Sequence, residues 1–136
     1  MVKKSLWVDS EAIRTNSYRF FLREDCGCSF DLCEYGEDII EKSRTKYDAA
    51  FFYLYRIGFQ TDELPEDFPF EAPEVYRNGI YVYNNFVKNP QNISTPVFLL
   101  HLPGRNRIIE YLDSLQKRRN HFCLSKYLKL NAVRSS

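Results

Sequence analysis

The fold of this chain is decided by one stretch, Tyr47-Asp48-Ala49-Ala50-Phe51-Phe52-Tyr53-Leu54-Tyr55, which Arg56-Ile57-Gly58 closes. A short apolar run that is rich in aromatic residues and bounded by charged residues and Gly predicts a strand buried on both faces. Such strands form the centre of parallel sheets, because crossover helices cover both sides. The C-terminal end of this strand carries Tyr53 and Tyr55, where a catalytic protein of this layout would more usually carry an acid.

Outward from this strand, apolar runs and helix-like segments alternate. Further strands are predicted at residues 4–8, 29–33, 95–100 and 122–125. Helices are predicted at residues 11–23, 37–46, 80–88 and 105–118. Five strands that alternate with four helices predict a doubly wound α/β domain, since parallel strands need right-handed helical crossovers.

Local signals set the ends and the buried sides of these helices. Ser10 is expected to cap the first helix, and Ile13, Phe20 and Phe21 are expected to face the core. Asn78-Gly79 is expected to start the third helix, which Asn89-Pro90 stops. In the fourth helix, the spacing of its Ile and Leu residues predicts one apolar face.

Between the third strand and the third helix, residues 59–77 are predicted to form a loop or an insertion. Its central part, residues 60–73, carries three prolines and five acidic residues. Neither a helix nor an internal strand accepts such a segment. Phe59, Phe68 and Phe70 could attach it to the domain or present it to a partner. Residues 1–136 are expected to form a single domain, with a short or truncated C-terminal end at residues 129–136.

Composition describes an ordinary globular chain of 136 residues with 44% hydrophobic and 27% charged residues. The net charge of +1 provides no overall field to attract nucleic acid or an anionic membrane. No apolar stretch approaches the roughly 18 residues that span a bilayer, and the N-terminus lacks the apolar core of a signal peptide. The chain is therefore expected in the cytoplasm.

The four cysteines are most simply thiols that pack as small hydrophobic side chains in a reducing compartment. The alternative is a metal site built from Cys26, Cys28 and Cys33, with His121 as a further ligand. A Cys-x-Cys pair does not have the usual spacing of a zinc site, and no second pair follows. The first interpretation is preferred.

Several short motifs follow one another in a specific order. Val8-Asp9-Ser10-Glu11 follows the first strand, Tyr47-Asp48 opens the third, and Asn78-Gly79 opens the third helix. Asn89-Pro90 precedes Thr95-Pro96-Val97, and Leu124-Ser125-Lys126 ends the fifth strand. In this order, from residue 3 to 128 apart from 60–73, they resemble the receiver domain of bacterial two-component response regulators. The resemblance implies a flavodoxin-like sheet in the strand order 2-1-3-4-5.

The same resemblance implies a degenerate phosphorylation pocket. Receivers accept a phosphoryl group on an aspartate at the end of the third strand, and Tyr53 stands at that position. A phenol cannot form the acyl phosphate of the family. Of the acidic pair that helps to hold magnesium, Asp9 remains and Ser10 replaces its neighbour, so Mg²⁺ binding is expected to be weak or absent.

Two further positions depart from the family. His101 replaces the hydroxyl residue after the fourth strand that senses the phosphoryl group, and Cys123 stands where the fifth strand has an aromatic switch. Lys126 matches the invariant lysine. An ion pair between Asp9 and Lys126 is expected, with the ring of Tyr53 filling the vacated pocket. His101 is expected to be a polar loop residue.

The resemblance therefore implies a pseudo-receiver, a non-enzymatic module that signals through protein contacts without phosphorylation and without a cofactor. Partners or a second copy would dock on the face formed by the fourth helix and the fifth strand. Its residues are Arg105, Arg107, Tyr111, Cys123 and Tyr127. The chain could be the N-terminal regulatory part of a transcription regulator, with nucleic acid bound only by an effector domain beyond residue 136.

Two alternatives stay open. One is an active phosphotransfer receiver with an unorthodox acceptor, such as Asp48 or an acid of residues 60–73. The other is a domain that binds a small ligand at the C-terminal ends of the strands, where open α/β sheets bind ligands. The chain has no Gly-rich phosphate loop after the first strand, which disfavours a nucleotide.

Overall fold

The computed structural model describes residues 3–11, 16–59, 74–101 and 121–125. The strands are β1 (Lys3–Val8), β2 (Cys28–Cys33), β3 (Ala49–Tyr53), β4 (Val97–His101) and β5 (His121–Ser125). The helices are α1 (Asn16–Cys26), α2 (Gly36–Lys42), α3 (Glu74–Lys88) and the short 3₁₀ helix η2 (Pro90–Asn92). Among these helices of the described ranges, none has the length and apolar character needed to cross a bilayer.

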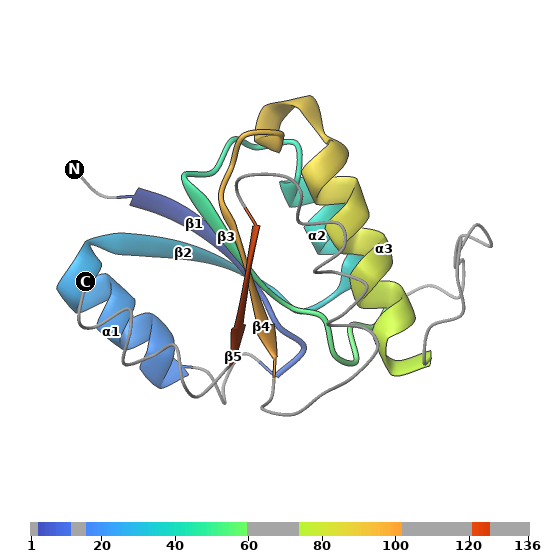
Figure 1. Cartoon of the computed structure of the whole chain (residues 1–136), viewed down its shortest axis with the longest axis horizontal. Helices are drawn as coiled ribbons and strands as arrows, with labels where there is room; N and C mark the ends of the chain where they lie inside the picture. The colour runs from blue at the N-terminus through green and yellow to red at the C-terminus, as the bar shows by residue number, and fades with distance from the viewer. Residues whose placement is uncertain (1–2, 12–15, 60–73, 102–120, 126–136) are drawn as a thin grey trace.

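All five strands pair in parallel, in the order β2-β1-β3-β4-β5 (Figure 1). This is the order of flavodoxin-like sheets, and it confirms the predicted doubly wound α/β fold. Helix α1 covers one face of the sheet, while α2 and α3 cover the other (Figure 1). The carboxyl ends of all five strands therefore meet at one edge of the sheet.

Strand β3 is buried on both faces, as its apolar sequence predicts. It lies between β1 and β4, and Ala50, Phe51, Phe52 and Tyr53 are each at most 6% exposed. Phe52 points into the larger core cluster, which α2 and α3 close, whereas Phe51 points into the smaller cluster beneath α1. Both faces are covered because helices lie on both sides of a parallel sheet.

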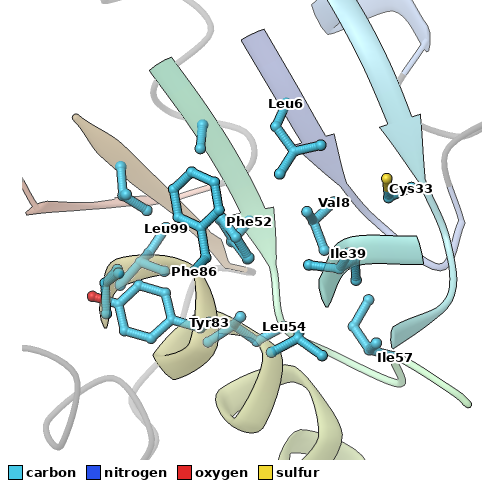
Figure 2. Close-up of a cluster of buried hydrophobic side chains, with 14 of the residues drawn as sticks. Leu6, Val8, Cys33, Ile39, Phe52, Leu54, Ile57, Tyr83, Phe86 and Leu99 are labelled. Atoms are coloured by element: carbon cyan, nitrogen blue, oxygen red, sulfur yellow. The ribbon is translucent and has the colours of Figure 1, made fainter. Parts of the chain in front are cut away.

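The larger cluster packs aliphatic side chains of the sheet against aromatic side chains of α3 (Figure 2). The ring of Phe52 lies 5.2 Å from that of Phe86 and 5.8 Å from that of Tyr83, measured between centroids. Leu6, Val8, Ile39 and Phe52 have no exposed surface. Burial of a side chain of this size stabilises the fold by about 1.5–3 kcal/mol, so this cluster is a large part of the driving force for folding.

Beneath α1, an aromatic ladder crosses the middle of the sheet. Trp7 pairs with Phe51 in the register of β1 and β3, and Phe51 pairs with Phe98 in the register of β3 and β4. Their rings stack with centroids 5.1 Å and 4.9 Å apart. Stacked cross-strand pairs favour one strand register over its neighbours, because a shift by one residue would move every ring to the other face.

Helix α1 buries a different side from the one that the sequence predicts. Phe20 is 52% exposed, whereas Arg19 and Leu22 are buried. Arg19 occupies the inner side because its guanidinium carbon lies 5.3 Å from the centroid of the Trp7 ring, a cation–π arrangement. The expected core role of Phe20 is therefore wrong, Phe21 is half-buried, and Ile13 lies outside the described residues.

Ser10 does not cap α1. Its hydroxyl donates instead to the carbonyl oxygen of Tyr55, at 3.2 Å, and α1 begins at Asn16. The expectation was wrong because a Ser ahead of a helical pattern can also satisfy its hydroxyl on a neighbouring loop, and here the loop after β3 lies within reach.

Helix α3 begins earlier than predicted. It starts at Glu74 rather than at residue 80, so Asn78 and Gly79 lie inside it and residues 74–77 of the predicted loop are helical. Gly79 is needed there, because a Cβ atom at this position would collide with the carbonyl oxygen of Leu54. The Asn78 side-chain amide donates to the carbonyl oxygen of Ile57 at 2.9 Å. Close packing against the loop after β3 therefore outweighs the poor helix propensity of Gly.

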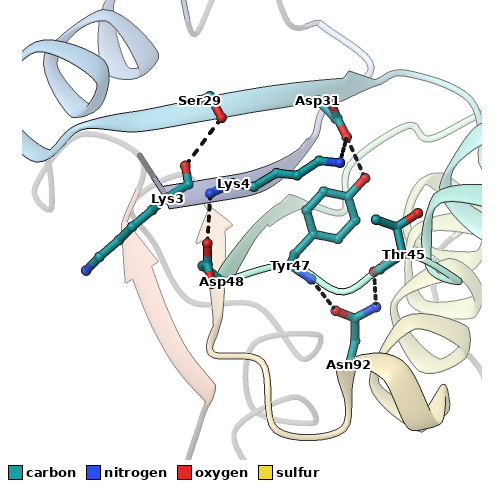
Figure 3. A network of polar contacts seen from close by, with 8 residues as sticks. All are labelled: Lys3, Lys4, Ser29, Asp31, Thr45, Tyr47, Asp48 and Asn92. Carbon is teal, nitrogen blue, oxygen red and sulfur yellow. Dashed lines mark hydrogen bonds and ion pairs between the residues drawn. The ribbon is translucent and has the colours of Figure 1, made fainter. Parts of the chain in front are cut away.

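Helix α2 ends at Lys42, four residues before its predicted end, and a polar network follows it (Figure 3). The side-chain amide of Asn92 donates to the carbonyl oxygens of Ser43 and Thr45, each at 2.7 Å. Its side-chain oxygen accepts from the Tyr47 backbone at 3.0 Å and from the Thr95 hydroxyl at 2.9 Å. One buried side chain thus fixes the chain between α2 and β3.

Three predicted segments lie outside the described residues. They are the acidic segment 60–73, the fourth helix at residues 105–118, and the C-terminal end at residues 129–136. Their predicted structures remain predictions.

Candidate functional site

The candidate site is the edge of the sheet where the parallel strands end. Val8 pairs with Phe52, so Asp9 follows β1 at the level of Tyr53, the last residue of β3. Tyr53 in turn pairs with Leu100. His101 is the last residue of β4 and not the loop residue that the sequence predicts, because it still pairs with Ser125 of β5. The fold therefore brings the backbone positions of Asp9, Tyr53 and His101 to neighbouring strand ends, as the sequence predicts.

Tyr53 is held as a neutral phenol. Its side chain is 5% exposed, and its ring centroid lies 6.1 Å from that of Tyr55. Burial raises the pKa of Tyr53 to about 12, and Tyr76, Asp9, Glu11 and Tyr55 add to this shift because each disfavours a nearby phenolate. A phenol with so high a pKa is a weak nucleophile at neutral pH, and it offers no carboxylate to a phosphoryl donor.

Asp9 is fully buried and already bound to the backbone. One of its carboxylate oxygens accepts from the backbone N–H of Glu11 at 2.9 Å, and its own N–H donates to the carbonyl oxygen of Cys33 at 3.0 Å. Burial lowers the pKa of Arg19, and the negative charge of Asp9 opposes that shift. Asp9 therefore lies in the field of a buried guanidinium.

Aromatic rings surround the C-terminal end of β3. The Tyr55 ring contacts the rings of both Tyr53 and Tyr76, and its centroid lies 5.6 Å from that of Tyr76 in an edge-to-face arrangement. The guanidinium carbon of Arg56 lies 5.0 Å from the Tyr55 ring centroid, and Arg56 has a φ of 58°. Among the described residues, Arg56 is the one non-glycine with a positive φ, a conformation that costs about 1 kcal/mol or more and marks a sharp turn at this strand end.

Sequence reasoning missed three residues that act on Tyr53 or Asp9. These are Glu11, Arg19 and Tyr76. Glu11 could have been found from its place in the same motif as Asp9, two residues later. Arg19 gave no signal, because a buried Arg that packs on a Trp breaks the apolar pattern used to find the inner side of a helix.

The other predicted pocket residue and most of the predicted interaction face lie outside the described residues. They are Lys126, Arg105, Arg107, Tyr111 and Tyr127. The ion pair of Asp9 with Lys126 thus stays a prediction. Of Cys123 only the strand position is described, opposite Leu99 in the ladder of β4 and β5.

Cys28 and Cys33, two cysteines of the alternative metal site, are not brought together. Cys28 belongs to the cluster beneath α1 and Cys33 to the cluster beneath α2 and α3, so the two thiols lie on opposite faces of β2. Across the described ranges, no three Cys, His, Asp or Glu residues are grouped to hold a metal ion. Burial raises the pKa of the Cys33 thiol to about 12 and also raises that of Cys28, which keeps both protonated and unreactive.

Asp48, the alternative phosphoryl acceptor, lies at the far end of the sheet. Its carboxylate accepts from the backbone N–H of Lys4 at 2.9 Å, near the start of β1 (Figure 3). Asp9 follows the end of β1, five residues after Lys4, and five residues of an extended strand span about 17 Å. Asp48 and Asp9 therefore cannot act on one phosphoryl group.

No known protein family and no curated protein matches the sequence. Solved structures do match the fold. The receiver domain of a sensor histidine kinase from Pseudomonas aeruginosa, which has a magnesium ion coordinated in its active-site cleft, is similar with a TM-score of 0.67 and 16% identity over 99% of this chain and 93% of that chain. A two-component response regulator from Clostridium difficile is similar with a TM-score of 0.62 and 21% identity over 98% of this chain and 90% of that chain.

A response regulator receiver domain protein from Methanospirillum hungatei is also similar, with a TM-score of 0.63 and 13% identity over 99% of this chain and 90% of that chain. The described part of the chain thus has the flavodoxin-like fold of receiver domains. At these identities the likeness establishes the fold alone, and the chemistry has to be judged from the residues at the strand ends.

Proposed function

We propose that this chain is an atypical receiver domain that signals through protein contacts and is not switched by phosphorylation. The observation that supports this most strongly is Tyr53, which ends the central strand of a receiver fold as a buried, neutral phenol. Receivers carry the phosphoryl acceptor aspartate at this place, by the resemblance of the sequence. A receiver fold without that carboxylate keeps the scaffold and loses the covalent switch.

Magnesium binding is proposed to be weak or absent. Mg²⁺ requires near-octahedral coordination by hard oxygen atoms, usually including one or two carboxylates. Here Asp9 already accepts from Glu11, and the Tyr55 carbonyl oxygen, a possible ligand, accepts from the Ser10 hydroxyl. The Tyr53 phenol adds no negative charge. The residues present therefore do not fit the ion.

A domain that signals through protein contacts needs a surface on which its partner docks. By resemblance to the family, we propose the face of the fourth helix and the fifth strand, with Arg105, Arg107, Tyr111, Cys123 and Tyr127 as its residues. Its partner would be another protein or a second copy of the chain. On this proposal the domain is not an enzyme and works in the cytoplasm, with nucleic acid bound only by a further effector domain.

The test is phosphorylation by a small-molecule donor. The purified chain is incubated with acetyl phosphate and Mg²⁺, and its intact mass is measured. We expect no gain of a phosphoryl group, because no carboxylate ends β3. A receiver with an intact acceptor aspartate serves as the control that the donor is active.

Two variants locate any label that does appear. A magnesium-dependent gain of mass that is lost in Asp9→Asn would mean that the pocket works, and it would overturn the proposal. A gain that is lost in Asp48→Asn but kept in Asp9→Asn would assign the acceptor to the opposite end of the sheet, and it would overturn the proposal equally.

A further inference from the structure

The loop that follows β3, residues 54–59, is bound by the elements around it, and we call it the strap. The carbonyl oxygen of Tyr55 accepts from the hydroxyl of Ser10, beyond the end of β1, at 3.2 Å. The carbonyl oxygen of Ile57 accepts from the side-chain amide of Asn78, in α3, at 2.9 Å. The middle of the strap is therefore fixed from two sides.

The end of the strap reaches the segment that follows β2. Gly58 forms a parallel bridge with Tyr35, and its carbonyl oxygen accepts from the backbone N–H of Gly36 at the start of α2, at 2.8 Å. In the sheet, β1 lies between β2 and β3 and ends at Val8. A chain that leaves β3 and pairs beyond β2 therefore crosses the line of β1, just past the point at which β1 ends.

Apolar and steric contacts hold the strap as well. Leu54 and Ile57 are 4% and 2% exposed and belong to the larger core cluster (Figure 2). The ring of Phe59 packs so closely on Gly36 that a Cβ atom there would collide with it. At the other end of the strap, a Cβ atom at Gly79 would collide with the Leu54 carbonyl oxygen. A segment with this many buried contacts opens only at a high cost in free energy.

The strap passes the place where open α/β sheets usually bind ligands. That place lies outside the carboxyl ends of the strands, at the switch point between β1 and β3. Asp9, which follows β1, has no exposed surface, and Tyr53, which ends β3, is 5% exposed. The two strand ends at the switch point are therefore closed to a ligand that approaches from solvent.

We propose that the strap locks the domain in one conformation and closes the switch point to small ligands. Segments that move in conformational switches have few buried contacts. The strap is a segment of the opposite kind, because three different elements bind its carbonyl oxygens. A single fixed surface for the partner follows if phosphorylation does not switch the domain, so this inference rests on the proposed function.

Hydrogen exchange of the Gly36 amide measures the opening of the strap, because this N–H donates to Gly58. In the wild type, we expect this amide to exchange no more than about tenfold faster than the amides of the central strand β3. Relaxation dispersion reports motion on the microsecond to millisecond timescale, and we expect none at residues 54–59.

Asn78→Ala removes one contact of the strap. We expect the exchange of the Gly36 amide, relative to that of the β3 amides, to become about tenfold faster, because a buried carbonyl loses its partner. Asn85→Ala is the matched control. The Asn85 side chain donates to the Tyr81 carbonyl oxygen within α3, at 3.0 Å, so a similar hydrogen bond is lost away from the strap. We expect the ratio to change by less than about twofold there.

If Asn78→Ala fails to fold, Ser10→Ala releases the Tyr55 carbonyl oxygen and provides the same test. Two outcomes would overturn the inference. One is a mobile strap in the wild type, seen as relaxation dispersion or as Gly36 exchange more than about tenfold faster than that of β3. The other is an equal ratio in Asn78→Ala and Asn85→Ala. Both leave the proposed function standing, whereas labelling by acetyl phosphate overturns that function, so the two failures are distinguishable.

Discussion

Tyr53 is the residue on which the proposed function depends most. Its backbone continues the ladder to β4 as any strand residue does, and its ring adds to the aromatic cluster after β3. On the function proposed above, the position differs from a phosphoryl acceptor because its side chain is a phenol and not a carboxylate. Because its environment favours the neutral phenol, the hydroxyl also makes folding sensitive to high pH.

The pH dependence of stability should change when this hydroxyl is removed. Folding raises the pKa of Tyr53 from 10.0 to about 12. The folded state therefore holds this proton more tightly, and the associated stability is complete below pH 10 and is lost as pH rises through about 12. We expect the free energy of unfolding of Tyr53→Phe to fall less steeply over this range than that of the wild type.

Urea unfolding of both proteins at several pH values between about 9 and 12 measures this difference. Tyr47, whose pKa is also raised by burial and by its hydrogen bond to Asp31, is present in both proteins and cancels in the comparison. Parallel curves for the two proteins would show that the Tyr53 hydroxyl is not buried as described.

Gly79 gives a test of packing in which two effects have opposite signs. Helix propensity alone predicts that Gly79→Ala stabilises α3 by about 1 kcal/mol. A Cβ atom there would collide with the Leu54 carbonyl oxygen, which belongs to the rigid backbone after β3. We expect the collision to dominate, with a net loss of about 1–3 kcal/mol in the free energy of unfolding.

The matched control for this substitution is Gly58→Ala. A Cβ atom at Gly58 meets nothing within 4 Å, and its φ is not in the left-handed region. We expect a change within about 0.5 kcal/mol there. A stabilised Gly79→Ala variant would mean that α3 does not pass as close to β3 as described.

At the scale of elements, the strands were easier to predict than the helices. β3 follows from composition alone, because a strand that is covered on both sides needs apolar residues at every position. Helix ends depended on tertiary contacts that the sequence does not display. Gly79 resembles a start signal but is a packing site, and Ser10 resembles a cap but binds the Tyr55 carbonyl.

The end of α2 depends on Asn92, which lies in η2 and is distant in sequence. We expect Asn92→Ala to lower the free energy of unfolding by about 3 kcal/mol, since it leaves the buried backbone groups of Ser43 and Tyr47 without their partners. Thermal or urea unfolding measures the loss. Gln91→Ala is the control, because Gln91 is exposed and uses only its backbone N–H in the bond to Asn89.

A loss of less than about 1 kcal/mol in Asn92→Ala would indicate that water replaces the amide, and that the network does not fix the end of α2.

At the scale of the whole molecule, the order of elements and motifs along the chain predicted the fold better than the residue types predicted the site. The alternation of strands and helices gave the fold class, and the resemblance of the motif order to receivers implied the strand order that the sheet has. The site could be predicted only in part. The positions of Asp9 and Tyr53 follow from the strand ends, but the roles of Arg19, Glu11 and Tyr76 depend on which side chains the packed fold brings beside them.

The most direct test of the central claim is a titration with beryllium fluoride and Mg²⁺, followed by amide NMR. Beryllium fluoride mimics a phosphoryl group only where a correctly placed carboxylate accepts it. We expect no saturable shifts at Asp9, Ser10 and Tyr53, because β3 ends in a phenol. Saturable, magnesium-dependent shifts at these residues would contradict the account and would show that the domain is a working phosphorylation switch.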